Sequence, residues 1–236
     1  CKKKKLFLIE DDCHSLNINK NVNSYSNIIF FSLRKILIKS YSGGVLSINS
    51  KLDDKFLNKF KLKRYQVSFK TRINNFLENN LLIFKRFLKF KLLKMPNFSK
   101  LNSIKNEKIT EDFLIDDFSK KVFLKKKFNE IKKTRIKNYM IWRNLCKKNK
   151  SIEIIKRNLN KNTIPWVFPV FVKNNQTRKK LFQYGWRNGY SIISWPTLPA
   201  NLVNKRNKKI WNKLVCFNTD RAPNIKNINF NNIKIR

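Results

Sequence analysis

The chain has few of the residues that build metal sites and disulfide frameworks. It contains one histidine and four cysteines in 236 residues, and no two cysteines form a C-x-x-C pair. A zinc site is therefore excluded, and nothing suggests a disulfide framework. The apolar stretch 81–93 is interrupted by four basic residues and is too polar to span a membrane. We expect a reducing, cytoplasmic setting and no membrane partner.

Acidic residues are also scarce, with 14 Asp and Glu against 54 Lys and Arg and a net charge of +40. Such an excess favours nucleic acid as a partner, because Lys and Arg neutralise phosphates. However, Asn, Ile and Phe are abundant together with Lys, Ala and Gly are scarce, and lysines run from Lys2 to Lys234. This is the pattern of A/T-rich codons. We attribute most of the charge to composition bias, which leaves nonspecific nucleic-acid binding open.

What the chain does contain is apolar sequence for a core: 42% of its residues are hydrophobic and 13% are aromatic. That is enough for one or two domains. Near the start, Leu6–Ile9, Ile28–Phe31 and Val45–Ile48 are short apolar runs bounded by polar residues, which is typical of buried strands. Ligands of open α/β sheets bind just past the strand ends. The candidate reactive residues at those positions are Asp11, His14, Ser32 and Lys35.

Each of these residues alone has a structural interpretation, since a single lysine is usually solvated and a single aspartate often caps a helix. Together they follow a specific order. The first predicted strand is followed by a Glu-Asp pair and a histidine. The second is followed by a serine, then a lysine three residues later, and then by Gly43-Gly44. Over residues 6–46 this order resembles the DegT/StrS family of pyridoxal-phosphate-dependent sugar aminotransferases. The segment Phe31–Lys35 reads FSLRK, as in one branch of that family.

The resemblance implies pyridoxal 5'-phosphate as the cofactor. Lys35 would be the catalytic residue that holds it covalently, and Asp11 would keep its pyridine nitrogen protonated. Ser32 would donate to its phosphate, and His14 would lie against its ring. The segment between the lysine and the glycine pair is one residue longer than the family pattern. Lys39 therefore stays open as the alternative, and Lys35 is preferred because it directly follows FSLR.

A second block, at about 130–223, follows the C-terminal order of the same family. It contains a helix that opens on Arg135–Tyr139, a strand over Ile164–Val172, a WPTLP segment at 195–199 and a last strand at Leu214–Phe217. Helices are predicted at 176–185 and 208–213, and a further strand at Tyr190–Ser194. The prolines at 165 and 169 favour an edge position for the strand that contains them.

From these blocks we predict an α/β fold, specifically a partial fold-type I pyridoxal-phosphate-dependent transferase. Residues 1–60 would form the C-terminal part of the cofactor-binding large domain, 61–130 a helical connecting region and 131–236 a small C-terminal domain. Family members carry roughly half their length before this point. We therefore expect the chain to be the C-terminal portion of a longer protein, and to fold poorly and bind the cofactor weakly when expressed alone.

The function implied by the resemblance is transfer of an amino group from an amino acid, with glutamate favoured, to a nucleotide-linked keto sugar. Such a step belongs to the biosynthesis of surface polysaccharides or related sugars, and the complete enzyme would be a cytoplasmic homodimer. The alternative is a basic nucleic-acid-binding or ribosome-associated protein of an A/T-rich genome. Aromatic residues interleaved with cations, as in Phe84–Phe87, favour it. It requires neither the Glu10-Asp11 pair nor the WPTLP segment.

Overall fold

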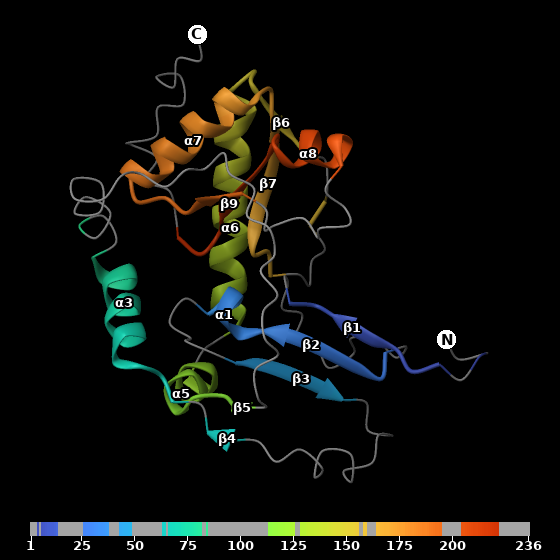
Figure 1. The fold of residues 1–236 in the computed structure, drawn as a ribbon, viewed down its shortest axis with the longest axis vertical. Helices are drawn as coiled ribbons and strands as arrows, with labels where there is room; N and C mark the ends of the chain where they lie inside the picture. Colours follow the sequence, from blue (N-terminus) through green and yellow to red (C-terminus); the bar gives the residue numbers. More distant parts are fainter. Residues whose placement is uncertain are drawn as a thin grey trace. The chain divides into compact units, whose positions relative to one another are not determined.

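The computed structural model describes residues 4, 6–13, 26–37, 43–48, 63–64, 66–81, 84, 113–125, 128–155, 158–159, 164–194 and 204–221. The chain forms two compact units (Figure 1). The first unit comprises Cys1–Asn79, Ile109–Lys132 and Leu159–Trp166. The second comprises Asn80–Lys108, Lys133–Asn158 and Val167–Arg236.

The first unit contains a three-stranded sheet of order β1-β2-β3 (Figure 1). Its strands are β1 (Ile9–Asp11), β2 (Ile28–Ser32) and β3 (Gly44–Ile48). β1 runs parallel to β2, and β3 runs antiparallel to it. The central strand β2 is buried at Ile28, Ile29 and Phe31, as its apolar run predicts. The four-residue helix α1 (Leu33–Ile36) follows β2 directly, and Ile36 packs with Ile29 and Phe31 in the core.

The prediction of a buried strand over Leu6–Ile9 is wrong in both position and burial. β1 begins only at Ile9, whose side chain is 53% exposed, and Leu6 is 57% exposed. β1 lies at the edge of the described sheet and pairs with β2 alone. Before β1 begins, the Leu8 N–H donates to Asn27 Oδ1 at 2.8 Å, and the Leu8 carbonyl accepts from the Asn27 N–H at 2.9 Å. Backbone and side-chain hydrogen bonds, and not burial, therefore hold this segment.

Two further helices and a small parallel strand pair belong to the same part of the chain. The strands are β4 (Lys63–Arg64) and β5 (Phe113–Leu114), and the helices are α3 (Phe69–Asn80) and α5 (Asp117–Lys125). Asp116 caps α5, because its Oδ1 accepts from the Ser119 N–H at 2.8 Å. This bond satisfies one of the donors that a helix start leaves unpaired.

The second unit is built on a four-stranded antiparallel sheet of order β6-β7-β9-β8. The strands are β6 (Ile152–Ile154), β7 (Val167–Val172), β8 (Ile192–Ile193) and β9 (Leu214–Asn218). The helices are α6 (Phe128–Lys147), which begins in the first unit, α7 (Asn175–Arg187) and α8 (Lys205–Trp211). The helix and strand predictions for 176–185, 208–213 and 214–217 are confirmed to within a few residues. In the part of the chain that the structure describes, no helix is both long and apolar enough to cross a membrane.

An aromatic cluster joins α6 to the sheet of the second unit. The ring centroids of Trp142 and Phe217 lie 4.7 Å apart, and those of Tyr139 and Phe168 lie 4.8 Å apart in a T-shaped arrangement. All four residues are at most 5% exposed. Offset and edge-to-face contacts of this kind add to the free energy gained from burying the rings. The aromatic residues of α6 are thus core residues of the second unit.

Polar residues of α6 fasten the end of β9 to the helix. Asn138 Nδ2 donates to the Thr219 carbonyl at 2.9 Å, and Arg135 Nη1 donates to Thr219 Oγ1 at 3.2 Å. Burial lowers the pKa of Arg135, and the nearby Asp220 carboxylate opposes this shift. The Arg135–Tyr139 segment therefore has a clear structural role, which is to connect α6 to the chain after β9.

The predicted strand Ile164–Val172 is divided between the two units. β7 starts at Val167, whereas Ile164 is 3% exposed and packs against Ile29 and Phe31 in the core of the first unit. A run of apolar residues indicates burial but not which of two cores receives each residue. The division falls directly after Trp166.

The prediction that β7 is an edge strand is also wrong, since β7 pairs with β6 on one side and β9 on the other. The Val172 N–H donates to the Lys213 carbonyl and the Lys173 N–H donates to the Ser151 carbonyl. By alternation, the position of the missing Pro169 N–H is on the β6 side. β6 ends at Ile154, opposite Val170, so Pro169 lies just past its end. The proline is tolerated because no ladder bond is required of it there.

We predict that Trp142→Leu destabilises the protein strongly. The change removes the contact with Phe217 and the 3.1 Å hydrogen bond from Trp142 Nε1 to the Asn218 carbonyl. The free energy of unfolding, measured by urea denaturation of the full-length protein, should fall by about 3 kcal/mol. Met140→Leu is the matched control, because Met140 lies on the same helix and is 41% exposed. Equal effects of the two substitutions would contradict the assigned core.

Candidate functional site

The parallel pairing of β1 and β2 brings predicted site residues to one edge of the first sheet. Asp11 is the last residue of β1 and Ser32 the last residue of β2. Lys35 follows within α1, which starts where β2 ends (Figure 1). This edge is where the carboxyl ends of parallel strands position ligands. His14 and the alternative Lys39 lie outside the described residues.

The two acidic residues that end β1, Glu10 and Asp11, make different contacts. Ser26, which is 4% exposed, donates from Oγ to Glu10 Oε2 at 3.2 Å. Successive side chains of a strand point to opposite faces of the sheet, so Asp11 faces the other way. Asp11 Oδ1 accepts from the Cys13 N–H at 2.9 Å in a tight turn. Glu10 thus supports the fold, and Asp11 is the carboxylate of the candidate site.

The Cys13 thiol reports on the charges around it. Its pKa is raised to about 11, first by burial, then by a hydrogen bond to Asp11 and by the Asp11 charge. The Lys35 ammonium acts in the opposite direction and lowers the pKa of Cys13. Asp11 and Lys35 therefore both lie close enough to Cys13 to act on one thiol. Sequence reasoning gave Cys13 no role, although its position two residues after Asp11 was the available signal.

Trp166 is a neighbour of Lys35 that sequence reasoning missed. Lys35 Nζ lies 5.3 Å from the centroid of the Trp166 ring, and both side chains are half-buried. An ammonium over an indole face is stabilised by the charge distribution of the ring. Ile164, anchored in the core of the first unit, holds the chain before Trp166 in place. The two residues are far apart in the sequence, so no local spacing could have indicated this contact.

The Ser32 hydroxyl stands at the start of α1 without capping it. Ser32 occupies the N-cap position, with φ −94° and ψ 111°, but its side chain makes no hydrogen bond to the helix. A serine at this position usually accepts a hydrogen bond from the first turn. Here its hydroxyl can donate to an anionic ligand at the edge of the sheet.

The glycine pair allows β3 to approach this site closely. Gly43 has φ +96°, and a Cβ added there would lie 2.6 Å from Ile115 Cγ1. A Cβ on Gly44 would lie 2.8 Å from the Phe31 carbonyl oxygen. The Gly43 carbonyl accepts from the Leu33 N–H at 3.2 Å, which ties the pair to the first residue of α1. The pair thereby fixes the backbone on both sides of Ser32.

In chemical terms the site combines an amine, a carboxylate and a hydroxyl donor. These groups can supply a nucleophile, a hydrogen-bond acceptor and a hydrogen-bond donor. Of the predicted residues, the structure brings together Asp11, Ser32 and Lys35. It adds Cys13 and Trp166 to them.

We predict that substitutions of Asp11 and Lys35 change the reactivity of Cys13 in opposite directions. Asp11→Asn removes a charge that raises the pKa of Cys13, so alkylation by iodoacetamide at pH 8.5 should be faster, because the thiolate is the reactive form. Lys35→Ala removes a charge that lowers this pKa, so alkylation should be slower. The rates are measured by mass spectrometry of the Cys13 peptide. Lys121→Ala serves as a charge-matched control, and rates unchanged in both variants would rule out the proximity of these three residues.

We predict that Gly43→Ala destabilises the first sheet. A residue with a Cβ is strained at φ +96°, which costs about 1–3 kcal/mol, and the Cβ also meets Ile115. Urea denaturation of the full-length protein should show this loss. Ser47→Ala, at an exposed position of β3, is the control and should change the free energy of unfolding by less than about 0.5 kcal/mol. A stable Gly43→Ala variant would contradict the close approach of β3.

Solved structures with a similar fold include aminotransferases. PseC of Helicobacter pylori, an aminotransferase involved in the biosynthesis of pseudoaminic acid, matches 99% of this chain with a TM-score of 0.50 and 12% identity. The match covers 58% of the Helicobacter chain. A DegT DnrJ EryC1 StrS aminotransferase from Brucella abortus matches 93% of this chain and 53% of its own, with a TM-score of 0.48 and 9% identity. Spr1654 of Streptococcus pneumoniae, in its PLP form, matches 96% of this chain and 55% of its own, with a TM-score of 0.48 and 12% identity.

At this level of identity the likeness concerns the fold. No profile of a known protein family matches the chain, and no curated protein matches it. The chain spans little more than half the length of the aminotransferases whose structures it resembles. The predicted fold class is confirmed: this is a mixed α/β chain that matches part of the fold of the Helicobacter aminotransferase.

Proposed function

We propose that the complete protein is a pyridoxal-phosphate-dependent aminotransferase that acts on a sugar. One observation carries the proposal: Asp11, Ser32 and Lys35 are gathered at the carboxyl edge of a sheet in a fold shared with a sugar-pathway aminotransferase. An amine, a carboxylate and a free-standing hydroxyl are the groups that this cofactor requires of its protein.

The side chains at this edge carry the chemical groups that would hold the cofactor. Lys35 would hold it covalently, Asp11 would accept a hydrogen bond from its ring nitrogen, and Ser32 would donate to its phosphate. The bound cofactor supplies an electron-withdrawing ring that acidifies the Cα–H of an amino acid. Lys35 Nζ would also be the base that accepts the proton from that Cα. The Trp166 ring lies against Lys35 Nζ and would help to position this amine.

The finer assignments extend this proposal. The amino donor is an amino acid, with glutamate favoured, and the acceptor is a keto sugar linked to a nucleotide. The complete protein is a homodimer and works in the cytoplasm. His14 would lie against the cofactor ring, as the sequence motif implies. The alternative of a basic nucleic-acid-binding protein has no support from the comparisons.

The experiment is a spectroscopic test of the lysine on the full-length protein. Purified protein loaded with pyridoxal 5'-phosphate should absorb in the visible, and Lys35→Ala should lose this band. Borohydride should then fix the cofactor on the peptide that contains Lys35 in the parent protein. Lys39→Ala is the matched control and should keep the band.

Two results would count against the assignment. If Lys39→Ala loses the band and Lys35→Ala keeps it, Lys39 is the lysine that holds the cofactor. No band in any variant, with the protein folded by circular dichroism, would overturn the proposed function.

A further inference from the structure

Helix α3 exposes large apolar side chains along one of its sides. Phe69, Ile73 and Phe76 are 77%, 44% and 60% exposed. Their spacing of four and then three residues places them on one face of the helix, and we call them the apolar stripe of α3. Exposed apolar residues that are scattered singly need no explanation, but three on one helix face indicate an interaction surface.

The helix that carries this stripe is capped at its start by Ser68. Its carbonyl accepts from the Arg72 N–H at 3.1 Å, and its Oγ accepts from the Thr71 N–H at 3.3 Å. The hydroxyl oxygens of Ser68 and Thr71 also form a hydrogen bond of 2.8 Å. These bonds satisfy donors that a helix start leaves unpaired. The apolar stripe is therefore presented by a helix whose first turn is fixed.

Two exposed cations border the apolar stripe. Lys70 and Arg72 belong to the first turn, which contains no acidic residue. At about 100° per residue, Lys70 lies on one side of the stripe and Arg72 on the other. Cations near a helix N-terminus oppose the helix macrodipole, so these two do not serve the stability of α3 itself. A negatively charged partner would compensate for them.

The side of α3 away from the stripe is polar. The same helical repeat places Thr71 and Asn74 there, and Asn74 is exposed. The helix thus combines an apolar stripe, cations on both borders and an uncharged polar side. This pattern is typical of amphipathic helices that lie in the interface of a bilayer.

The charge of the chain helps to decide which partner fits this surface. A second copy would bring cations against cations, because the chain has 54 Lys and Arg and only 14 Asp and Glu. A nucleic acid would neutralise Lys70 and Arg72, but it stacks on aromatic rings and would leave the aliphatic Ile73 in water. An anionic bilayer meets both requirements, since its headgroups are negative and its acyl region is apolar.

We propose that α3 docks the protein on the surface of an anionic bilayer. The apolar stripe enters the boundary between headgroups and acyl chains, and Lys70 and Arg72 reach to the lipid phosphates. The helix lies in the plane of the surface and does not cross the bilayer, in agreement with the lack of a spanning helix among the described residues. The proposal departs from the sequence-based expectation of no membrane partner, which considered only spanning segments.

The experiment is flotation of the full-length protein with vesicles of phosphatidylglycerol and phosphatidylcholine at physiological ionic strength. Phe69→Gln should lower the partition coefficient by about tenfold, because it removes the most exposed ring of the stripe. Its exposure means that the substitution leaves the core intact. Asn74→Gln, the matched control, places the same residue on the polar side of the same helix and should change the coefficient by less than about twofold. Equal effects would overturn the proposal.

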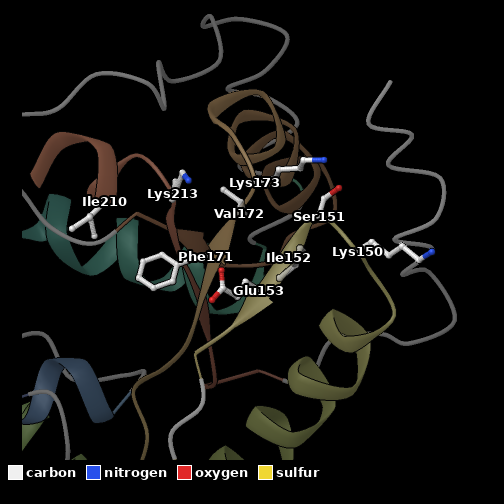
Figure 2. Close-up of a pocket in the computed structure, with 9 residues that line it drawn as sticks. All are labelled: Lys150, Ser151, Ile152, Glu153, Phe171, Val172, Lys173, Ile210 and Lys213. Atoms are coloured by element: carbon white, nitrogen blue, oxygen red, sulfur yellow. The ribbon is translucent and has the colours of Figure 1, made fainter. Parts of the chain in front are cut away.

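A second pair of variants tests the cations that border the stripe. Lys70→Gln should lower partitioning into the anionic vesicles by about fivefold and leave pure phosphatidylcholine vesicles unaffected. Lys173→Gln is the charge-matched control. Lys173 is also exposed, but it lies at a cavity on β6 and β7 that Glu153 also lines (Figure 2). Equal losses in both variants would show a general attraction of the positive chain and would reject a specific surface on α3.

Other occupants of the apolar stripe give different results. A parent protein that does not float with anionic vesicles would overturn the proposal, and self-association that Phe69→Gln prevents would then assign the stripe to a second copy. Tighter binding of a single-stranded oligonucleotide than of vesicles, lost in Phe69→Gln, would assign it to nucleic acid. Because pyridoxal phosphate takes no part in these measurements, their outcome does not depend on the aminotransferase proposal.

Discussion

The parallel register between β1 and β2 is the constraint on which the candidate site depends. It sets Asp11 opposite Phe30, two residues before the end of β2, and α1 then carries Lys35 onward. A shift of one residue would turn Asp11 to the other face and Glu10 toward Lys35. The Leu8–Asn27 hydrogen bonds and the Ser26–Glu10 bond oppose such a shift. A few individually weak hydrogen bonds thus keep the residues of the candidate site in register.

Sequence reasoning succeeded where a pattern is local. β2, α7 and β9 were predicted nearly to the residue, because an apolar run or a helical spacing reports directly on its own burial. The assignment of Asp11, Ser32 and Lys35 as site residues rests on the resemblance to a family motif, and it stays a prediction. Trp166 was missed because its contact with Lys35 depends on the fold and not on any neighbour in the sequence. The exposure of Ile9 was missed because an apolar run does not reveal an edge strand.

The described cations at buried positions are arginines, although lysine is the more abundant cation of the chain. Among the residues described, the cations in the buried class are Arg135 and Arg178, while lysines occupy more exposed positions. Arg178 lies 4.1 Å from the Trp211 ring centroid, and burial lowers its pKa to about 10. A planar guanidinium stacks and forms directed hydrogen bonds, which an ammonium cannot reproduce. Bias toward lysine codons is therefore tolerated at the surface and resisted where the geometry of the cation matters.

Pro169 limits the growth of the second sheet. If β6 were one residue longer, the next carbonyl on its side would face a proline that has no hydrogen to donate. Strand addition along that stretch of β7 would leave a buried acceptor unsatisfied, which costs about 1–3 kcal/mol. An incoming strand from another copy of the chain meets the same barrier. Pro169 therefore disfavours the pairing of any further strand with this stretch of β7.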